Sequence, residues 1–377
     1  MRSPKISWSA RCVAVLSGLL LGVAANAERF DVYPYDASGD CDEPFERMAN
    51  ALQPGDELVV HHGVYTQSCA RSIEVRGTPS QPILIRAADG AHPTFTRPAD
   101  RSEEHNNIEI VNSAHLTVRG LRFFGGSIGV RFIGGSDLTF EHNEVAATAS
   151  SAITINSGDA TRLKLRHNHI HHSGQSRNVA TTGEGIYAGC NRATCTVSDS
   201  LFEYNHIHHL RATARGGNDG IEIKPGSGGN VIRYNRIHDT TIGRAFPCIF
   251  VYGNSDRPNL VHDNHVARCG EAIQVVADAM VFNNTVLDSS IAGIVSMPHA
   301  QVGAPRNVTI RNNVVAGHPM CVQIDWRKAS KVALRRNTLR CAGSTAVRAA
   351  GLGNALVEGN VYTGKSDVLI EGLARER

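Results

Sequence analysis

The segments LTFEHNEV (138–145), LKLRHNHI (163–170), SLFEYNHI (200–207) and NVIRYNRI (230–237) decide the fold of this chain. Each contains an apolar residue, a gap, an asparagine, a gap and another apolar residue. Five further copies are LVHDNHV (260–266), MVFNNTV (280–286), VTIRNNVV (308–315), VALRRNTL (332–339) and ALVEGNVY (355–362). Their asparagines lie 20 to 37 residues apart, and a repeat in this range indicates a solenoid. Short β-branched runs broken by glycine and asparagine indicate strands rather than helices.

The repeated asparagine has two properties that suit a turn between stacked strands. It tolerates left-handed backbone geometry, so we expect it to form the bend itself. Its side-chain amide carries both donors and an acceptor, so asparagines stacked coil on coil can form a hydrogen-bonded ladder. The residues concerned are Asn143, Asn168, Asn205, Asn235, Asn264, Asn284, Asn313, Asn337 and Asn360.

The repeat resembles the right-handed parallel β-helix of polysaccharide lyases and related carbohydrate-active proteins, over roughly residues 56 to 365. The resemblance implies an all-β, single-stranded right-handed parallel β-helix. Each coil of such a solenoid contacts only its neighbours, so we interpret residues 28–377 as one domain. The segment PFERMANAL (44–52) has the pattern of a short amphipathic helix, which we expect to cap the N-terminal end of the solenoid.

Residues 1–27 have the features of a secretory signal peptide. Arg2, Lys5 and Arg11 supply the positive region, an apolar run covers 13–23, and Ala-Asn-Ala (25–27) fits a cleavage site. The apolar run is shorter than the roughly 20 residues that span a bilayer, so we expect no membrane span after cleavage. The sequence therefore predicts a secreted or periplasmic protein.

The charge of the chain changes when this segment is removed. The 38 Lys and Arg residues of the whole chain become 35, which equals the number of Asp and Glu residues. A neutral mature chain has no general basic field that would attract nucleic acid. We expect no nucleic-acid partner, and any anionic ligand must be held by local groups.

Eight cysteines remain after Cys12 is removed with the signal, and an even number in an exported chain predicts disulfides. Sequence neighbours are the expected pairs, because one coil separates Cys248 from Cys269 and also Cys321 from Cys341. Cys190 and Cys195 would close a small loop. Free buried thiols are the alternative.

A second repeated element lies between the asparagine segments and predicts a strand in each coil. The aligned copies are GVRFI (129–133), AITIN (152–156), GIYAG (185–189), GIEIK (220–224), CIFVY (248–252), AIQVV (272–276), GIVSM (293–297) and CVQID (321–325). Because side chains alternate across a strand, positions two and four should face the core and positions three and five should face solvent. One outward column then contains Thr154, Tyr187, Glu222, Phe250 and Gln274, and the other contains Asn156, Lys224 and Tyr252.

Polar and aromatic residues are concentrated on this outward face in the middle coils. Glu184, Asp219, Glu222 and Lys224 should lie close to Tyr187 and Tyr252. Charged groups beside aromatic rings on a flat sheet are typical of a sugar-binding groove, for which we also expect contributions from Asn156, Phe250 and Gln274. An ordinary solvated surface is the alternative.

The segment GNDGIEIKPGSGGNVIRYNRIHD (217–239) resembles the calcium-and-lysine segment of the chondroitinase B and alginate lyase group and of a lysine-based pectate lyase group. The resemblance implies that Asn218, Asp219 and Glu222 hold Ca²⁺ and that Lys224 is the base. Glu184, one coil away, could add a further ligand. In the chondroitinase-like group an arginine assists, for which Arg215 and Arg244 in the flanking loops are candidates.

Elementary chemistry agrees with that implication. A lyase removes the weakly acidic C5 proton of a uronic acid, which requires neutralisation of the adjacent carboxylate. A calcium ion can provide this. A lysine near the metal would have a lowered pKa and could accept the proton. Tyr252 could donate a proton to the leaving oxygen or stack against a sugar.

We therefore expect a monomeric polysaccharide lyase that acts on an acidic polysaccharide. A glycoside hydrolase or epimerase on the same groove is one alternative, with Glu184 and Glu222 as paired carboxylates. A non-catalytic glycan- or surface-binding solenoid is another.

Histidines are also dense, as in RHNHIHH (166–172) and YNHIHH (204–209). His171, His208 and His238 follow the asparagine at the same distance. Stacked turn histidines explain this pattern, and a copper or zinc site is the alternative.

Overall fold

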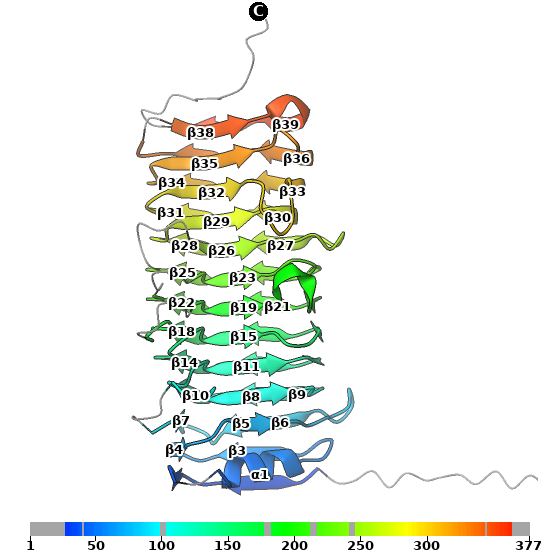
Figure 1. Cartoon of the computed structure of the whole chain (residues 1–377), viewed down its shortest axis with the longest axis vertical. Coiled ribbons are helices and arrows are strands. Elements are labelled where there is room, and N and C mark those ends of the chain that lie inside the picture. Colours follow the sequence, from blue (N-terminus) through cyan, green and yellow to red (C-terminus); the bar gives the residue numbers. More distant parts are fainter. Residues whose placement is uncertain are drawn as a thin grey trace, which may run out of the picture.

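The computed structural model describes residues 27–39, 41–98, 103–176, 182–211, 217–240, 246–343 and 345–363. Parallel strands stack along one long axis, and the one α-helix of the described residues lies at the N-terminal end (Figure 1). The predicted signal peptide lies outside the described residues except for Ala27. No helix among the described residues is long and apolar enough to cross a membrane.

Three long parallel sheets form the walls of the described solenoid, and each coil between the first and the last contributes one strand to each sheet in turn. The first sheet contains β1 (Arg29–Val32), β3 (Glu57–Val60), β6 (Ile83–Ala87), β9 (Leu116–Arg119), β13 (Thr139–Glu141), β17 (Lys164–Arg166), β21 (Leu201–Glu203), β24 (Val231–Arg233), β27 (Asn259–His262), β30 (Ala277–Phe282), β33 (Arg306–Arg311), β36 (Ser330–Arg335) and β39 (Ala355–Glu358).

The second sheet follows the asparagine turn. It contains β2 (Tyr35–Ala37), β4 (Gly63–Gln67), β7 (Pro93–Thr96), β10 (Arg122–Phe124), β14 (Glu144–Ala146), β18 (His169–His171), β22 (His206–His208), β25 (Arg236–His238), β28 (His265–Ala267), β31 (Thr285–Leu287), β34 (Val314–Ala316), β37 (Thr338–Arg340) and β40 (Val361–Tyr362).

The third sheet completes each coil. It contains β5 (Arg71–Ile73), β8 (Ile108–Val111), β11 (Val130–Ile133), β15 (Ile153–Ile155), β19 (Ile186–Ala188), β23 (Ile221–Ile223), β26 (Pro247–Val251), β29 (Glu271–Val275), β32 (Ala292–Ser296), β35 (Met320–Asp325) and β38 (Thr345–Ala350). Smaller elements are the three-stranded sheet of β12 (Gly135–Ser136), β16 (Ala160–Thr161) and β20 (Val197–Ser198), and the 3₁₀ helices η2 (Asn191–Ala193) and η3 (Leu352–Asn354). The predicted parallel β-helix is confirmed.

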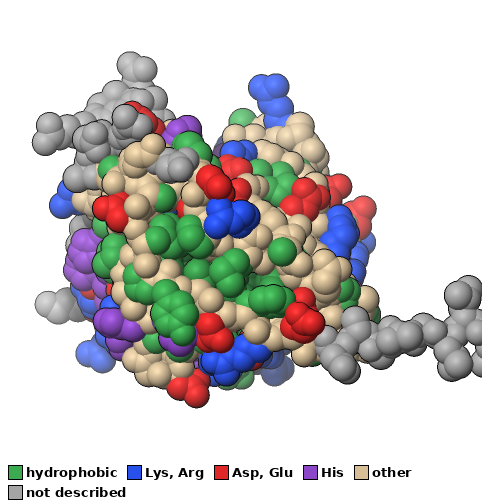
Figure 2. Space-filling model, turned by 90° about the horizontal axis from the view of Figure 1, so that it is seen from below, with side chains coloured by type: hydrophobic (Ala, Val, Ile, Leu, Met, Phe, Trp, Pro, Cys, Tyr) green, Lys and Arg blue, Asp and Glu red, His purple; other side chains and the backbone are tan. Residues whose placement is uncertain are grey.

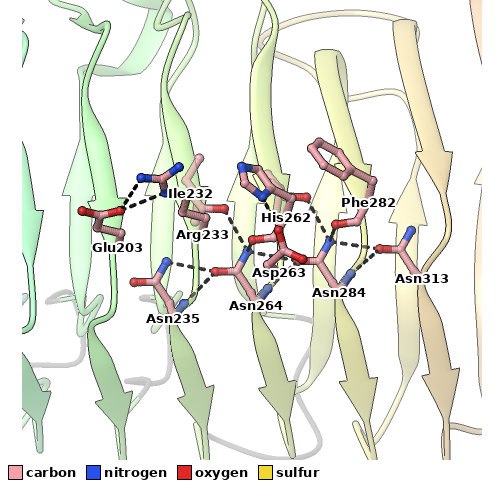
Figure 3. Close-up of polar contacts among 11 residues, drawn as sticks. Glu203, Ile232, Arg233, Asn235, His262, Asp263, Asn264, Phe282, Asn284 and Asn313 are labelled. Atoms are coloured by element: carbon pink, nitrogen blue, oxygen red, sulfur yellow. Dashed lines mark hydrogen bonds and ion pairs between the residues drawn. The ribbon is translucent and has the colours of Figure 1, made fainter.

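The asparagine ladder is present at the turn between the first and second sheets (Figure 3). Asn235 is typical, because its Nδ2 donates to Oδ1 of Asn264 at 2.9 Å and to the carbonyl oxygen of Phe202 at 2.9 Å. Its backbone N–H donates to the same Oδ1 at 3.0 Å. The same bonds repeat from Asn168 to Asn360, so each amide satisfies buried groups of its own and neighbouring coils.

The left-handed bend, however, is not at the asparagine. The residue before it has the positive φ, as at His142, Tyr204 and Asp263, whose φ values are 55°, 55° and 55°. The asparagine itself must direct its amide inward to the ladder, so the preceding residue makes the turn and directs its side chain outward. Our expectation for the position of the bend was wrong by one residue.

The register of the third sheet confirms the alignment made from the sequence. Ile153 pairs with Ile186, Ile186 with Ile221, and Ile221 with Ile249, and these side chains are fully buried. Helix α1 (Pro44–Ala51) covers the N-terminal end, where Phe45 is buried against Phe95 with ring centroids 4.6 Å apart. Both the predicted core columns and the predicted capping helix are confirmed.

The cysteines pair as neighbours in the sequence. Cys248–Cys269 and Cys321–Cys341 each connect successive coils, and Cys190–Cys195 closes a short loop. A fourth disulfide joins Cys41 to Cys69. The three pairings expected from the sequence are confirmed, and among the described residues none of these eight cysteines is left free.

Candidate functional site

A pocket of about 600 Å³ lies over the third sheet, at strands β15, β19, β23, β26 and β29. It contains nine of the residues expected from the sequence. They are Asn156, Glu184, Tyr187, Asp219, Glu222, Lys224, Phe250, Tyr252 and Gln274. The sequence alignment succeeded here because the strands stack in register, so equal positions in successive coils become neighbours.

Three expected residues are not part of the described pocket. Arg215 and Arg244 lie outside the described residues. Asn218 is fully buried and its Nδ2 donates to the carbonyl oxygen of Leu210 at 3.1 Å. Asp219 lines the pocket and the adjacent Asn218 does not, but Oδ1 of Asn218 is buried without a hydrogen-bond partner among the described residues, so its role as a metal ligand stays a prediction.

The strand register arranges the polar residues in columns. Tyr187 pairs with Glu222, Glu222 with Phe250, and Phe250 with Gln274. Extending the same register by three residues brings Glu184 opposite Asp219, where the backbone N–H of Gly185 donates to the carbonyl oxygen of Asp219 at 2.9 Å. Glu184 and Asp219 thus lie on adjacent coils, whose backbones are about 4.8 Å apart in a sheet.

The outward face of these coils is more enclosed than we expected. Glu222, Lys224, Phe250 and Tyr252 are only 3 to 6% exposed. Phe250 and Tyr252 stack on each other with centroids 4.0 Å apart and form a small apolar cluster with Val276. The prediction of solvent-facing side chains was wrong here, because these large side chains cover each other and the charged residues beside them.

Lys224 is at the centre of the site. Its Nζ lies 2.5 Å from Oε1 of Glu222, 4.4 Å from the ring centroid of Tyr187 and 5.0 Å from that of Tyr252. Burial alone would lower the pKa of Lys224, but Glu222, Tyr187 and Asp219 together outweigh burial and the pKa is raised. We had expected a lowered pKa beside a metal, and this arrangement instead favours the ammonium form.

The carboxyl groups have raised pKa values. Burial raises the pKa of Glu222 to about 7, although Lys224 opposes the shift. Burial and the neighbouring Glu222 raise the pKa of Asp219 well above its usual range, and burial raises that of Glu184. Oγ of Ser151 donates to Oε2 of Glu184 at 2.6 Å, while Oδ1 of Asp219 is buried without a protein partner. A shifted carboxyl cluster in a pocket is typical of a functional site.

His299 is a pocket residue that the sequence analysis missed. It follows β32, and its ring packs edge-on against Tyr252, with centroids 4.7 Å apart, and against Phe250 at 5.7 Å. Burial, with a smaller effect from Lys224, lowers its pKa, so the imidazole is neutral at neutral pH. His299 is outside both repeated segments, so no periodic signal in the sequence could have assigned it to this face.

The carboxylates do not converge as calcium ligands in this arrangement. Among the described residues, the groups of three His, Cys, Asp or Glu ligand atoms within 4.8 Å of one another do not include Glu184, Asp219 and Glu222. One oxygen of Glu222 is already bonded to Lys224. The fit to Ca²⁺, which takes six to eight oxygen ligands, is therefore poor, and calcium binding stays a prediction.

Comparisons with known proteins concern the fold. A family model described as "Right handed beta helix region" matches residues 60–202 and 106–315. An alginate lyase from Paenibacillus sp. is 17% identical, with a TM-score of 0.54 over 90% of this chain and 99% of that one. The catalytic unit of a GH87 α-1,3-glucanase from Streptomyces thermodiastaticus is 17% identical, with a TM-score of 0.52 over 87% and 67%.

An exopolygalacturonase from Thermotoga maritima is 12% identical, with a TM-score of 0.52 over 89% of this chain and 92% of that one. No curated protein sequence matches the chain. At such low identities, the similarity to these structures is evidence for a common fold alone.

Proposed function

Because this chain belongs to the right-handed β-helix family, we propose that it is a polysaccharide lyase, which cleaves a uronate-containing polymer by β-elimination in the pocket of the third sheet. The observation that carries the proposal is the position of Lys224 between the rings of Tyr187 and Tyr252, in contact with Glu222. The common fold with an alginate lyase is consistent with this chemistry.

Lys224 is the proposed base, and it must first lose its proton. Oε1 of Glu222, 2.5 Å from Nζ, is the proposed acceptor. At rest the pair favours the ammonium form of Lys224, and the raised pKa of Glu222, about 7, lessens the cost of moving the proton. A pocket closed by substrate also weakens the advantage of an ion pair over a neutral pair, because charges lose their hydration there. Glu222 therefore holds this proton on Oε1 while Lys224 is neutral.

In the elimination step the enzyme takes one proton from the substrate and gives one proton to the leaving group. Nζ of Lys224 takes the C5 proton, the C4–O bond breaks, and the electrons of the C5–H bond form the C4=C5 double bond. The leaving oxygen takes a proton from the hydroxyl of Tyr187. Tyr187 is more exposed than Tyr252 and contacts Lys224 directly, so it is the better placed of the two phenols.

The substrate carboxylate must be neutralised or hydrogen-bonded for C5 to lose its proton. We propose that protonated Asp219 and Glu184 donate hydrogen bonds to it, since burial favours their neutral forms. Buried carboxylic acids kept neutral can act as donors in this way. Asn156, Gln274, Phe250 and Tyr252 supply the polar and apolar contacts to flanking sugars.

The proposal also includes the localisation, the substrate class and the oligomeric state of the enzyme. We propose export to the periplasm or the exterior, supported by the four disulfides, which persist in oxidising compartments. We further propose an acidic polysaccharide as the substrate and a monomer as the working unit. Gel filtration with light scattering tests the monomer.

The test is an assay of the purified chain on a set of uronate polymers, in which new unsaturated ends are measured in the ultraviolet. Lys224→Ala should lower turnover about 10²–10⁴-fold with little change in binding, the usual contribution of a positioned base. Lys164→Ala is the matched control, because Lys164 is exposed on the first sheet. Normal turnover of Lys224→Ala would refute the base assignment.

Calcium dependence is tested in the same assay. Our proposed mechanism predicts that activity survives a calcium chelator. The prediction from the sequence, that Asp219, Glu222, Glu184 and Asn218 hold Ca²⁺, instead requires loss of activity with recovery when calcium is restored. In that case Glu222→Gln should be partly rescued by added calcium through mass action.

Glycoside hydrolysis is the second candidate, favoured by the position of Glu184 and Asp219 on adjacent coils. Hydrolases use two carboxyl groups on either side of the scissile bond, one of them with a raised pKa. Hydrolysis would give new reducing ends without ultraviolet absorbance. New reducing ends without ultraviolet absorbance from the parent, and their loss in both Glu184→Gln and Asp219→Asn, would show that the protein is a hydrolase and not a lyase.

A further inference from the structure

Histidine side chains gather on the second sheet, away from the pocket of the third sheet. Figure 2 shows histidines grouped along one side of the molecule. The register pairs His169 with His206 and His171 with His208, and it continues from His208 to His238. The residues between them on each strand, Ile170 and Ile207, are fully buried, so alternation directs both imidazoles of each strand outward.

Ring stacking explains only part of this arrangement. His171 and His208 stack with centroids 5.3 Å apart and nearly parallel planes, as does His208 on His238. In addition, the two columns approach each other across the face. Nε2 of His169 lies 2.8 Å from Nε2 of His208, and Nε2 of His206 lies 2.8 Å from Nε2 of His238. Stacking within a column does not require this convergence.

We propose that His169, His206 and His208 form a binding site for one divalent transition-metal ion of the zinc and copper class. Each of the three offers a ring nitrogen, and these atoms lie within 4.8 Å of one another on half-buried side chains that remain open to solvent. Three imidazoles with one open position are an established ligand set for Zn²⁺, and imidazole also suits Cu²⁺.

The geometry needs only a small change to accept an ion. With Zn–N bonds of about 2.0–2.1 Å, tetrahedral ligand nitrogens lie roughly 3.3 Å apart. The 2.8 Å contact between His169 and His208 must therefore open by about 0.5 Å, which small side-chain rotations can provide. The ion would replace the hydrogen bond that now joins the two rings.

A supporting contact orients one of the ligands. Nδ1 of His208 lies 2.6 Å from Nδ1 of His209, so the Nε2 atom of His208 is directed toward the cluster. Metal-bound histidines generally have such a partner on the second ring nitrogen. His209 is exposed, so it can be replaced with little risk to the fold. It is a positioning residue rather than a ligand.

Zinc titration of tag-free, chelator-treated protein by calorimetry tests the proposal. The parent should bind one Zn²⁺ per chain and unfold at a higher temperature when zinc is present. His169→Ala should lose this binding, and His209→Ala should weaken it roughly tenfold or more. His265→Ala is the matched control, because His265 occupies the same strand position as His206 two coils further on and should bind zinc as the parent does.

Two results would overturn the proposal. The first is absence of zinc binding by the parent. The second is unchanged binding in both His169→Ala and His209→Ala. Circular dichroism of each variant guards against misfolding, and the exposed His209→Ala still decides the matter if His169→Ala does not fold. Because Lys224 is on another sheet, failure of this site would leave the proposed lyase untouched, and the reverse also holds.

Discussion

At the scale of single residues, each ladder asparagine connects three coils. We predict that Asn235→Ala destabilises the protein by on the order of 3 kcal/mol, because groups of Asn205 and Phe202 lose their buried partner. Chemical unfolding measures the loss. Asn360→Ala is the control, since Asn360 ends the ladder and is half-buried, and it should cost about 1 kcal/mol. Equal losses at the two positions would contradict the cooperative ladder.

Glu271 gives a residue-scale prediction about pH. Burial raises its pKa to about 7, so the folded state favours the protonated form. The contribution of protonated Glu271 to the free energy of unfolding is fully present below the ordinary pKa of a carboxyl group. It is lost as the pH rises through about 7. Glu271→Gln mimics the protonated form at every pH. It should match the parent near pH 4 and exceed it above pH 7 by up to about 3 kcal/mol.

Thermal unfolding at several pH values measures this difference. Glu109→Gln serves as the control, because Glu109 is half-exposed on the same sheet and lies near Arg131. A Glu271→Gln variant with the same pH profile as the parent would mean that Glu271 is hydrated in solution.

The site residues illustrate how far the sequence could predict the chemistry. Periodicity was enough to bring Glu184, Tyr187, Asp219 and Lys224 into one pocket, because register makes equal positions adjacent. Periodicity could not predict the raised pKa of Lys224, because burial lowers this pKa and the acidic groups placed beside the ammonium, above all Glu222, raise it. It also could not find His299, whose position depends on a loop with no repeat.

At the scale of elements, the strands were predictable and the connections between them were not. The pairing of Ile153 with Ile186 follows from alternating apolar residues, which select one register. The turn at the asparagine has constant length, but the segment between the second and third sheets ranges from short to long. Its conformation depends on local contacts rather than on period, and this segment flanks the pocket.

The disulfides give the element-scale prediction. Cys248–Cys269 spans 21 residues and joins two coils, whereas Cys190–Cys195 spans 5 residues within one loop. Loop-closure entropy predicts about 3 kcal/mol of stabilisation for the longer bridge and about 2 for the shorter one. Replacing both cysteines of each pair by alanine, followed by unfolding in urea, measures the two values. A larger loss at the short bridge would indicate that local strain, rather than chain entropy, dominates.

At the scale of the whole molecule, the solenoid has a continuous core with an end that must be covered. A column of aromatic rings runs along the interior from Phe45 of α1 through Phe95, Phe123 and Phe140, with successive centroids 4.6 to 5.9 Å apart. Glu43 accepts hydrogen bonds from the first backbone N–H groups of α1 and forms a fully buried ion pair with Arg71. Helix α1, which covers the N-terminal end of the solenoid in Figure 1, thus protects the first coils by both packing and charge.

Coils that contact only their neighbours need not unfold together. A destabilising substitution at the N-terminal end should therefore first unfold only the nearest coils. We predict that Phe45→Ala, which removes about 3–5 kcal/mol of buried contacts, unfolds the N-terminal coils before the rest. Hydrogen exchange should then increase in β1 to β4 while β23 to β29 stay protected. Phe202→Ala is the control, because Phe202 is fully buried in the middle coils. In this variant the loss of hydrogen-exchange protection should extend from the middle coils toward both ends. Uniform loss of protection in Phe45→Ala would mean that the solenoid unfolds as one cooperative unit and that α1 stabilises all of it.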